Sequence, residues 1–339
     1  MIRKSINPKE ACVIVTYRCN ARCYMCNTWK YPTREKEEFS PALIDRLPKD
    51  LLFINITGGE PFLRSDINEI IKKILKRTKR LVISSNGFYT EKIIHSFEKF
   101  GNDLGIRISL EGFPSANDEL RGLKNGFERG LRTLTTLHSM GISDIGFGIT
   151  VSDRNSDDML DLYNLANAMG LEFATATVHN SFYFHTKENE FVNNEKIARA
   201  FEALAIELLS SKKIKNWFRA YFNMGLARKV RGQERTLPCE VGTDMFFLDP
   251  FANILPCNGS DHPMIMGNLN EQNFNEIWTS TKAERVRSQV AHCNKQCWMI
   301  GSASPAMKKK ILVPINWIIR YKLKMIFKSQ YSPFDAIKK

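Results

Sequence analysis

Short apolar runs alternate with longer amphipathic stretches through the first half of the chain, and this alternation constrains the fold more than any other feature. Helical spacing of apolar residues recurs in the stretches 67–77, 91–100, 127–140 and 157–169. The runs with strand character are Cys12 to Thr16, Leu51 to Thr57, Leu81 to Ser85, Ile106 to Leu110, Ile145 to Val151 and Leu171 to Val178. Repeated strand-helix-strand units predict an α/β fold with parallel strands, either a doubly wound sheet or a full or partial barrel.

The predicted sheet is followed by regions of different character. Two further helices are expected at 194–211 and 215–231, and a segment containing cysteine and glycine follows. We therefore expect a core at 1–232, a small extension at 233–303 and a tail at 304–339.

Polar motifs stand where the predicted strands end. TGGEP (57–61) follows the second strand, SSNG (84–87) the third, SLEG (109–112) the fourth and VSDRN (151–155) the fifth. Loops at the carboxyl ends of parallel strands meet at one edge, so these motifs predict the functional site. Asn86 and Asn155 belong to this edge, although turn formation explains an Asn in either motif equally well.

Composition and charge exclude several classes of protein. No apolar run approaches the ~18 residues of a membrane span, and the N-terminus has no signal-peptide anatomy, so we expect a cytoplasmic protein. The formal net charge is +13. Residues 304–339 hold 9 Lys and Arg and one acid, Asp335, so most of the excess lies in the tail. That distribution argues against nucleic-acid binding.

The spacing of the cysteines indicates metal chemistry. Reduced compartments disfavour disulfides, and three of the 8 cysteines, Cys19, Cys23 and Cys26, share one short loop. Three thiolates can hold a 4Fe-4S cluster and leave one iron open to a small ligand. A structural zinc ion would need a fourth ligand, which Cys12 could supply.

The motif CNARCYMC, followed by TGGEP, resembles the radical SAM superfamily over about residues 10 to 180. The resemblance implies a partial (β/α)6 barrel and a 4Fe-4S cluster that binds S-adenosylmethionine (SAM). It implies SAM contacts from Met25, beside the adenine, and from Gly58, Gly59, Glu60 and Pro61, at the amino group of the methionine part.

The end of the fourth strand carries a second resemblance. Ser109 and Arg121 resemble the pair that contacts the ribose and carboxylate of SAM in the subgroup with auxiliary clusters. Arginine suits this position because its planar fork can grip a carboxylate.

Four downstream cysteines form a second set: Cys239, Cys257, Cys293 and Cys297. The region 238–301 resembles the SPASM and shortened twitch extensions of radical SAM enzymes, which implies one auxiliary 4Fe-4S cluster. Four cysteines also suit a structural zinc ion, and this alternative stays open. Ala252 stands where the family usually has glycine in the turn before Cys257.

The resemblance implies reductive cleavage of SAM to a 5'-deoxyadenosyl radical, with electrons from a flavodoxin- or ferredoxin-like donor. The radical would abstract hydrogen from a small-molecule or sugar-like substrate, since the first strand starts at Cys12 without a preceding leader-binding domain. Only Cys12 remains as a spare thiol, which favours oxidation assisted by the auxiliary cluster over epimerisation. Glu111 and His179 are candidates for a substrate-side base.

Alternatives to this function remain open. One is a maturase that modifies a peptide or protein, and another is an epimerase that uses a thiol as hydrogen donor. A non-enzymatic metal-binding module is the alternative from a different class, and TGGEP and Arg121 argue against it.

The tail sequence INWIIRYKLKMIFK (315–328) predicts a basic amphipathic helix. One polar stripe is expected from Asn316, Arg320, Lys324 and Lys328, and the opposite apolar face from Ile315, Ile318, Ile319, Met325 and Ile326. With Trp317, Tyr321 and Phe327 nearby, the pattern is typical of a membrane-surface helix, which would place the protein at the inner face of the membrane. The alternative is a terminal helix docked on the barrel with solvated cations.

Overall fold

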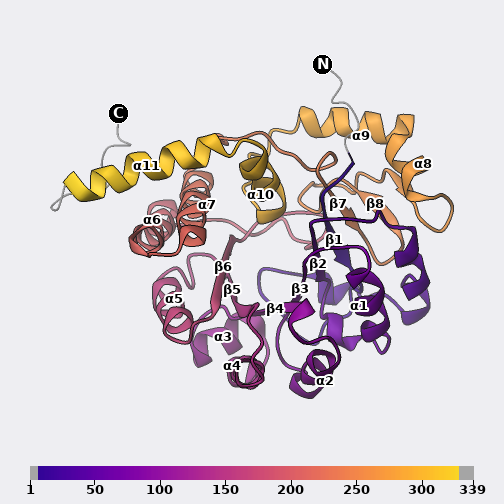
Figure 1. The fold of residues 1–339 in the computed structure, drawn as a ribbon, viewed down its shortest axis with the longest axis horizontal. Helices are drawn as coiled ribbons and strands as arrows, with labels where there is room; N and C mark the ends of the chain where they lie inside the picture. The colour runs from indigo at the N-terminus through magenta and orange to yellow at the C-terminus, as the bar shows by residue number, and fades with distance from the viewer. Residues whose placement is uncertain (1–6, 328–339) are drawn as a thin grey trace.

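The computed structural model describes residues 7–327, and its strands form one nine-stranded sheet in the order β6-β5-β4-β3-β2-β1-β7-β8-β9 (Figure 1). The strands are β1 (Glu10–Ile14), β2 (Phe53–Thr57), β3 (Leu81–Ser85), β4 (Leu104–Ser109), β5 (Ile145–Val151), β6 (Glu172–Thr177), β7 (Met245–Leu248), β8 (Asn253–Leu255) and β9 (Gly267–Asn268). Strands β1 to β7 pair in parallel, whereas β8 and β9 add as antiparallel strands. The predicted α/β fold with a parallel sheet is confirmed.

Helices surround the sheet (Figure 1). They are α1 (Ile67–Leu75), α2 (Thr90–Phe100), α3 (Pro114–Arg121), α4 (Gly126–Ser139), α5 (Asp158–Ala168), α6 (Asn194–Ser210), α7 (Ile214–Val230), α8 (Phe274–Thr279), α9 (Thr281–Ala291), α10 (Ile300–Lys309) and α11 (Leu312–Phe327). All six predicted strands are present, and β3 and β5 have the predicted bounds. Helix α3 was not predicted as a helix of its own.

Alternation along the strands divides the sheet into two faces. In β1, Ala11 and Val13 pack into the large core, whereas Cys12 and Ile14 belong to a small cluster on the other face with Tyr183. In β2, the buried Ile54 and Ile56 alternate with half-buried residues such as Asn55. The half-buried residues leave one face of the sheet partly polar, as a ligand-binding barrel needs.

Strand β7 joins the C-terminal segment to the sheet. It pairs with β1 from Glu10 opposite Met245 to Val13 opposite Leu248. The turn from β7 to β8 places Ala252 at φ 70°, a left-handed conformation that glycine adopts more readily. Asp249 stabilises this turn, because its Oδ1 accepts hydrogen bonds from the backbone of Phe251 and Asn253 at 2.9 and 2.8 Å. The turn therefore forms despite the alanine.

The predicted tail helix exists as α11, which packs on α7, and Lys328 and the rest of the tail lie outside the described residues. Its apolar residues do not share one face as expected. Ile318 is buried and Met325 packs on the core, whereas Ile319 and Ile326 are exposed. Within residues 7–327, no helix is both long and apolar enough to cross a membrane.

Candidate active site

The cysteine loop follows β1 and rests on the C-terminal end of α3. The backbone N–H groups of Arg22 and Tyr24 donate to the carbonyls of Arg121 and Leu120 at 2.9 and 3.1 Å. Gly122 ends α3 at φ 53°, and a Cβ there would lie 2.8 Å from the Arg22 carbonyl oxygen. Helix α3 thus holds one side of the loop that carries Cys19, Cys23 and Cys26.

The TGGEP motif holds the other side of the loop. Backbone N–H groups of Gly59 and Glu60 donate to the carbonyls of Thr16 and Arg18, each at 2.8 Å. A Cβ at Gly59 would lie 2.2 Å from the Arg18 carbonyl oxygen and 2.9 Å from Cβ of Cys19. Only glycine allows the TGGEP segment and the cysteine loop to approach this closely.

Glu60 ties three strand ends together from a fully buried position. Its carboxylate accepts hydrogen bonds from the Ser85 hydroxyl at 2.9 Å and from the Asn86 backbone at 2.8 Å. It also accepts from the backbone of Phe62, beyond Pro61, at 3.1 Å. Asn86 Nδ2 donates to Asn20 in the cysteine loop at 2.8 Å, so Asn86 belongs to the site.

Asn155 has a different role. Its amide donates to the backbone carbonyls of Glu111 and Thr150 at 2.9 and 3.0 Å, which stabilises the turn after β5.

Arg121 lies at the centre of the site, and Glu111 is its partner. Nη1 of Arg121 donates to Oε1 of Glu111 at 2.9 Å, and Oε2 accepts from the backbone of Thr150 at 2.7 Å. Burial raises the pKa of Glu111, although Arg121 opposes that shift. Both carboxylate oxygens are engaged, so the geometry suits a residue that positions Arg121 better than the expected free base.

The surroundings of Arg121 are anionic or acidic. Burial alone would lower its pKa, but Cys23, Glu111, Cys19 and Glu60 raise it above the ordinary value. Its Nε is buried and has no hydrogen-bond partner within residues 7–327. Ser109 ends β4 half-buried on the partly polar face of the sheet.

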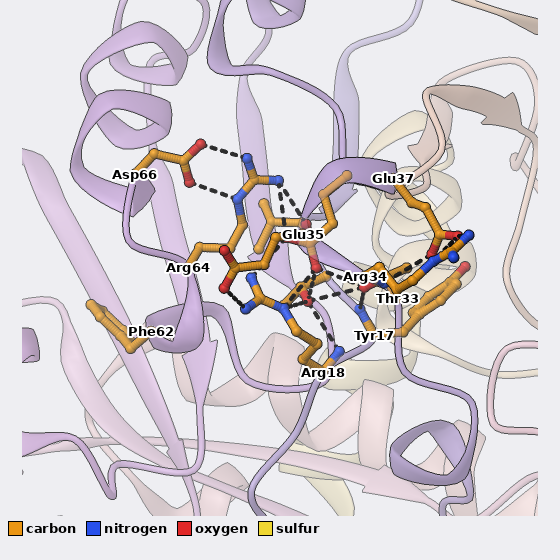
Figure 2. A network of polar contacts seen from close by, with 12 residues as sticks. Tyr17, Arg18, Thr33, Arg34, Glu35, Glu37, Phe62, Arg64 and Asp66 are labelled. Carbon is orange, nitrogen blue, oxygen red and sulfur yellow. Dashed lines mark hydrogen bonds and ion pairs between the residues drawn. The ribbon is translucent and has the colours of Figure 1, made fainter.

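A polar network fixes the residues just before the cysteine loop (Figure 2). Glu38, whose side chain is 2% exposed, accepts from Arg18 Nη2 at 2.9 Å and from the Thr33 hydroxyl at 2.6 Å, and it also contacts Thr16. Arg64 reaches the same carboxylate at 3.8 Å and donates to the carbonyl of Val15 at 2.9 Å. Sequence reasoning missed this network, because its members come from three separate segments and form no motif.

The downstream cysteines are also brought together. Cys239 raises the pKa of both Cys257 and Cys297, and Cys293 raises that of Cys297, so charge interactions connect the four thiols. Arg235 links their segments, because its guanidinium donates to the carbonyls of Pro238 at 3.2 Å and of Cys297.

Within the described residues, no three His, Cys, Asp or Glu side chains converge on a point that a single metal ion could occupy. An iron-sulfur cluster does not require the cysteines to converge on one point, because each cysteine binds a different iron.

The segment after β6 contacts both sets of cysteines. Near the first set, Phe184 accepts from the backbone of Asn27 at 2.8 Å, and Asn189 donates to the carbonyl of Met25 at 3.0 Å. Near the second set, the backbone of Phe182 donates to Ser260 at 2.9 Å. Residues 178–190 therefore form a strap between the segments of the two sets, and no sequence motif predicts it.

His179 lies near the start of this strap, and one of its ring nitrogens makes no hydrogen bond within the described residues. Its Nε2 is buried without a hydrogen-bond partner in residues 7–327, while the ring packs edge-on against Phe184 at 4.6 Å. Burial, with Lys229 and Lys295 nearby, lowers its pKa to about 3. The imidazole is therefore neutral at physiological pH and can accept a hydrogen bond from a ligand.

Comparison with known proteins agrees with this geometry. Residues 13–166 match the model of the radical SAM superfamily, and residues 239–299 match the SPASM iron-sulfur cluster-binding domain. The chain is a radical SAM enzyme with a SPASM domain.

Two curated relatives of this radical SAM enzyme match most of its length. The AdoMet-dependent heme synthase of Methanosarcina barkeri is 26% identical over 325 residues, which cover 88% of this chain and 89% of the relative. The subtilosin biosynthesis protein AlbA of Bacillus subtilis is 23% identical over 304 residues, covering 86% of this chain and 64% of AlbA.

Solved structures share the fold. SuiB of Streptococcus suis has a TM-score of 0.63 at 14% identity, covering 85% of this chain and 68% of SuiB. The structure titled native anSMEcpe with bound AdoMet has a TM-score of 0.62 at 13% identity, covering 92% of this chain and 99% of that one.

The two domains imply a SAM-binding 4Fe-4S cluster and auxiliary iron-sulfur chemistry, and the residues fit both. Burial raises the pKa of Cys19 to about 12 and that of Cys23 to about 11, so both are thiols in the metal-free protein and would have to lose their protons to hold a cluster. Nε of Arg121 could donate to the carboxylate of a ligand such as SAM. The same ligand would occupy the iron that the three cysteines leave open.

Proposed function

We propose that this radical SAM enzyme modifies a peptide or protein by oxidation, with the electron leaving through the auxiliary cluster. The observation that supports the oxidation is the strap 178–190, which contacts the segments of both cysteine sets and contains His179. When bound, the first cluster and SAM would supply the radical that abstracts hydrogen from the substrate.

The side chains of this protein would bind the two clusters and orient SAM and the substrate. Cys19, Cys23 and Cys26 would hold the SAM-binding cluster, and Cys239, Cys257, Cys293 and Cys297 the auxiliary one. Arg121, positioned by Glu111, would grip the carboxylate of SAM, beside Ser109, Met25 and the TGGEP backbone. His179 would accept a hydrogen bond from the substrate and so orient it.

Partly exposed aromatic rings support a large substrate. Tyr31 (58% exposed) stacks on His185 at 4.4 Å, and Tyr17 meets both His185 and the 41%-exposed Phe251 at about 6 Å. These residues follow β1, β6 and β7 at the carboxyl ends of the strands, where a parallel sheet holds its ligands. Such rings offer apolar contact area to the side chains of a peptide.

The similarity to AlbA, a bacteriocin biosynthesis protein, supports a peptide as the substrate. The sugar-like substrate that the sequence suggested has no comparable support. A tetrapyrrole is the second candidate, because the heme synthase matches nearly the full length of both chains.

Iron and SAM cleavage test the enzyme class. We expect about eight irons per chain after anaerobic reconstitution, falling to about four when Cys19, Cys23 and Cys26 are all changed to Ala, with deoxyadenosine formed only by the intact protein. Zinc without SAM cleavage would refute the proposal.

Substrate class is tested by offering a mixture of synthetic peptides and, separately, iron coproporphyrin. A peptide that loses two hydrogens and stimulates deoxyadenosine formation supports our assignment. Turnover of the porphyrin alone would favour the second candidate. His179→Gln should still cleave SAM but yield less oxidised product.

A further inference from the structure

The outward face of α11 is an aliphatic stripe without a cover in the described structure. Leu312 is 69% exposed, Ile319 53%, Leu323 47% and Ile326 72%. At 3.6 residues per turn these four side chains fall on one side of the helix, over a length of ~21 Å. Large aliphatic side chains exposed in a row indicate an interaction surface.

This stripe is not needed to hold the helix in place. The opposite side of α11 already packs on the protein: Trp317 meets Tyr221 at 5.5 Å, and Ile318 and Tyr321 are 5% and 7% exposed. Figure 1 shows α11 lying along the outside of the molecule with α7 beneath it. The helix therefore has two apolar faces, of which the protein uses one.

Cations flank the stripe, and the sequence from 304 to 334 contains no acidic residue. Lys310 and Arg320 are exposed beside it. Nζ of Lys322 lies over the ring of Trp217 at 3.8 Å, and Nζ of Lys324 over that of Tyr321 at 5.1 Å. Two copies meeting face to face would bring these like charges together, whereas an anionic surface would neutralise them.

We propose that α11 binds an anionic lipid membrane, with Leu312, Ile319, Leu323 and Ile326 inserted among the acyl chains and Lys310 and Arg320 at the headgroups. An aliphatic stripe and a basic flank are the two signals that interfacial helices combine. The helix would lie in the membrane surface without crossing it. This proposal is independent of the substrate assignment.

The test uses the full-length, reconstituted protein and sedimented vesicles. We expect binding to vesicles of equal parts phosphatidylglycerol and phosphatidylcholine, weak binding to phosphatidylcholine alone, and loss of binding as salt is raised. Leu323→Asp with Ile326→Asp should lower the bound fraction at least about tenfold. SAM cleavage in solution should not change, because both residues are exposed.

Two controls make the outcome decisive. Val192→Asp, at a position 89% exposed and outside the stripe, should bind vesicles as the wild type does. Replacing Lys310 and Arg320 by Gln should weaken binding to anionic vesicles only. Equal vesicle binding by the double Asp variant would overturn the proposal. Absence of vesicle binding, with a wild-type dimer that the same variant dissociates, would also overturn it and assign the stripe to self-association.

Discussion

Arg121 donates from Nη1 to Oε1 of Glu111 at 2.9 Å, and both residues are almost fully buried. Arg121 also supplies, through its backbone carbonyl, one of the bonds that hold the cysteine loop. The pair thus couples the orientation of a cationic side chain to the loop that carries Cys19, Cys23 and Cys26.

Changing Glu111 to Gln should disturb SAM binding more than catalysis. The variant leaves Arg121 buried beside a neutral partner, so we expect KM for SAM to rise about tenfold and stability to fall by about 3 kcal/mol. Initial rates of deoxyadenosine formation across SAM concentrations separate KM from kcat. Glu119→Gln, at an exposed carboxylate on α3, the helix that carries Arg121, should have neither effect. Unchanged KM in the Glu111 variant would contradict the positioning role.

Glu38→Gln should loosen the start of the cysteine loop. The substitution leaves Arg18 and Arg64 without their buried carboxylate, which we expect to cost about 3 kcal/mol. Glu35→Gln is the matched control, since Glu35 pairs with the same Arg18 but is 73% exposed, and it should cost under about 1 kcal/mol. Denaturant unfolding of the apo chain compares the two. Equal losses of unfolding free energy in the two variants would show that the buried Glu38 network stabilises the fold no more than the exposed ion pair does.

Gly59→Ala should prevent the close approach of TGGEP to the cysteine loop. The new methyl group would meet the Arg18 carbonyl oxygen at 2.2 Å, so we expect iron bound at the first cluster to fall by about half or more. Gly148→Ala in β5 provides the control, because its nearest neighbour would be Cβ of Arg107 at 4.0 Å. Iron content and circular dichroism after reconstitution distinguish a local defect from unfolding. Full iron content in the Gly59 variant would argue against tight packing here.

Asp249 should make folding stability depend on pH. Burial raises its pKa from 3.8 to about 6, so the folded chain holds this proton more tightly than the unfolded chain. Its contribution to stability is complete below the unfolded pKa and is lost as pH rises through about 6, a change of up to about 3 kcal/mol. Urea unfolding midpoints of the wild type and Asp249→Asn should therefore diverge between pH 4 and pH 7, at about these limits. Parallel curves would contradict the raised pKa.

Patterns along the chain predicted most of the fold, because a buried parallel strand is a short apolar run whatever surrounds it. The bounds of β3 and β5 follow directly from Leu81 to Ser85 and Ile145 to Val151. Helix α3 was not predicted because its eight residues, PSANDELR, are mostly polar. They contain too few apolar residues to show helical spacing. Its real signals are Pro114 at the start and the left-handed Gly122 at the end.

The site was predicted in its motifs but not in its connections. Glu111 was a candidate base from its place at a strand end, and only the three-dimensional structure shows that Arg121 and Thr150 occupy both of its oxygens. The strap between the cysteine sets and the Glu38 network depend on contacts between distant segments, which leave no local pattern. In α11, helical periodicity identified apolar positions but not which of them α7 would cover.

The pairing of β1 with β7 also bears on how the chain is made. Strand β1 is synthesised before the other strands of the sheet, but Met245–Leu248, which covers its other edge, is synthesised after β2 to β6 and α1 to α7. During that interval the nascent sheet has an open edge along Glu10–Val13, and an open parallel edge invites pairing with other chains. The β1 edge is therefore the part of this sheet that stays open to mispairing for longest during synthesis.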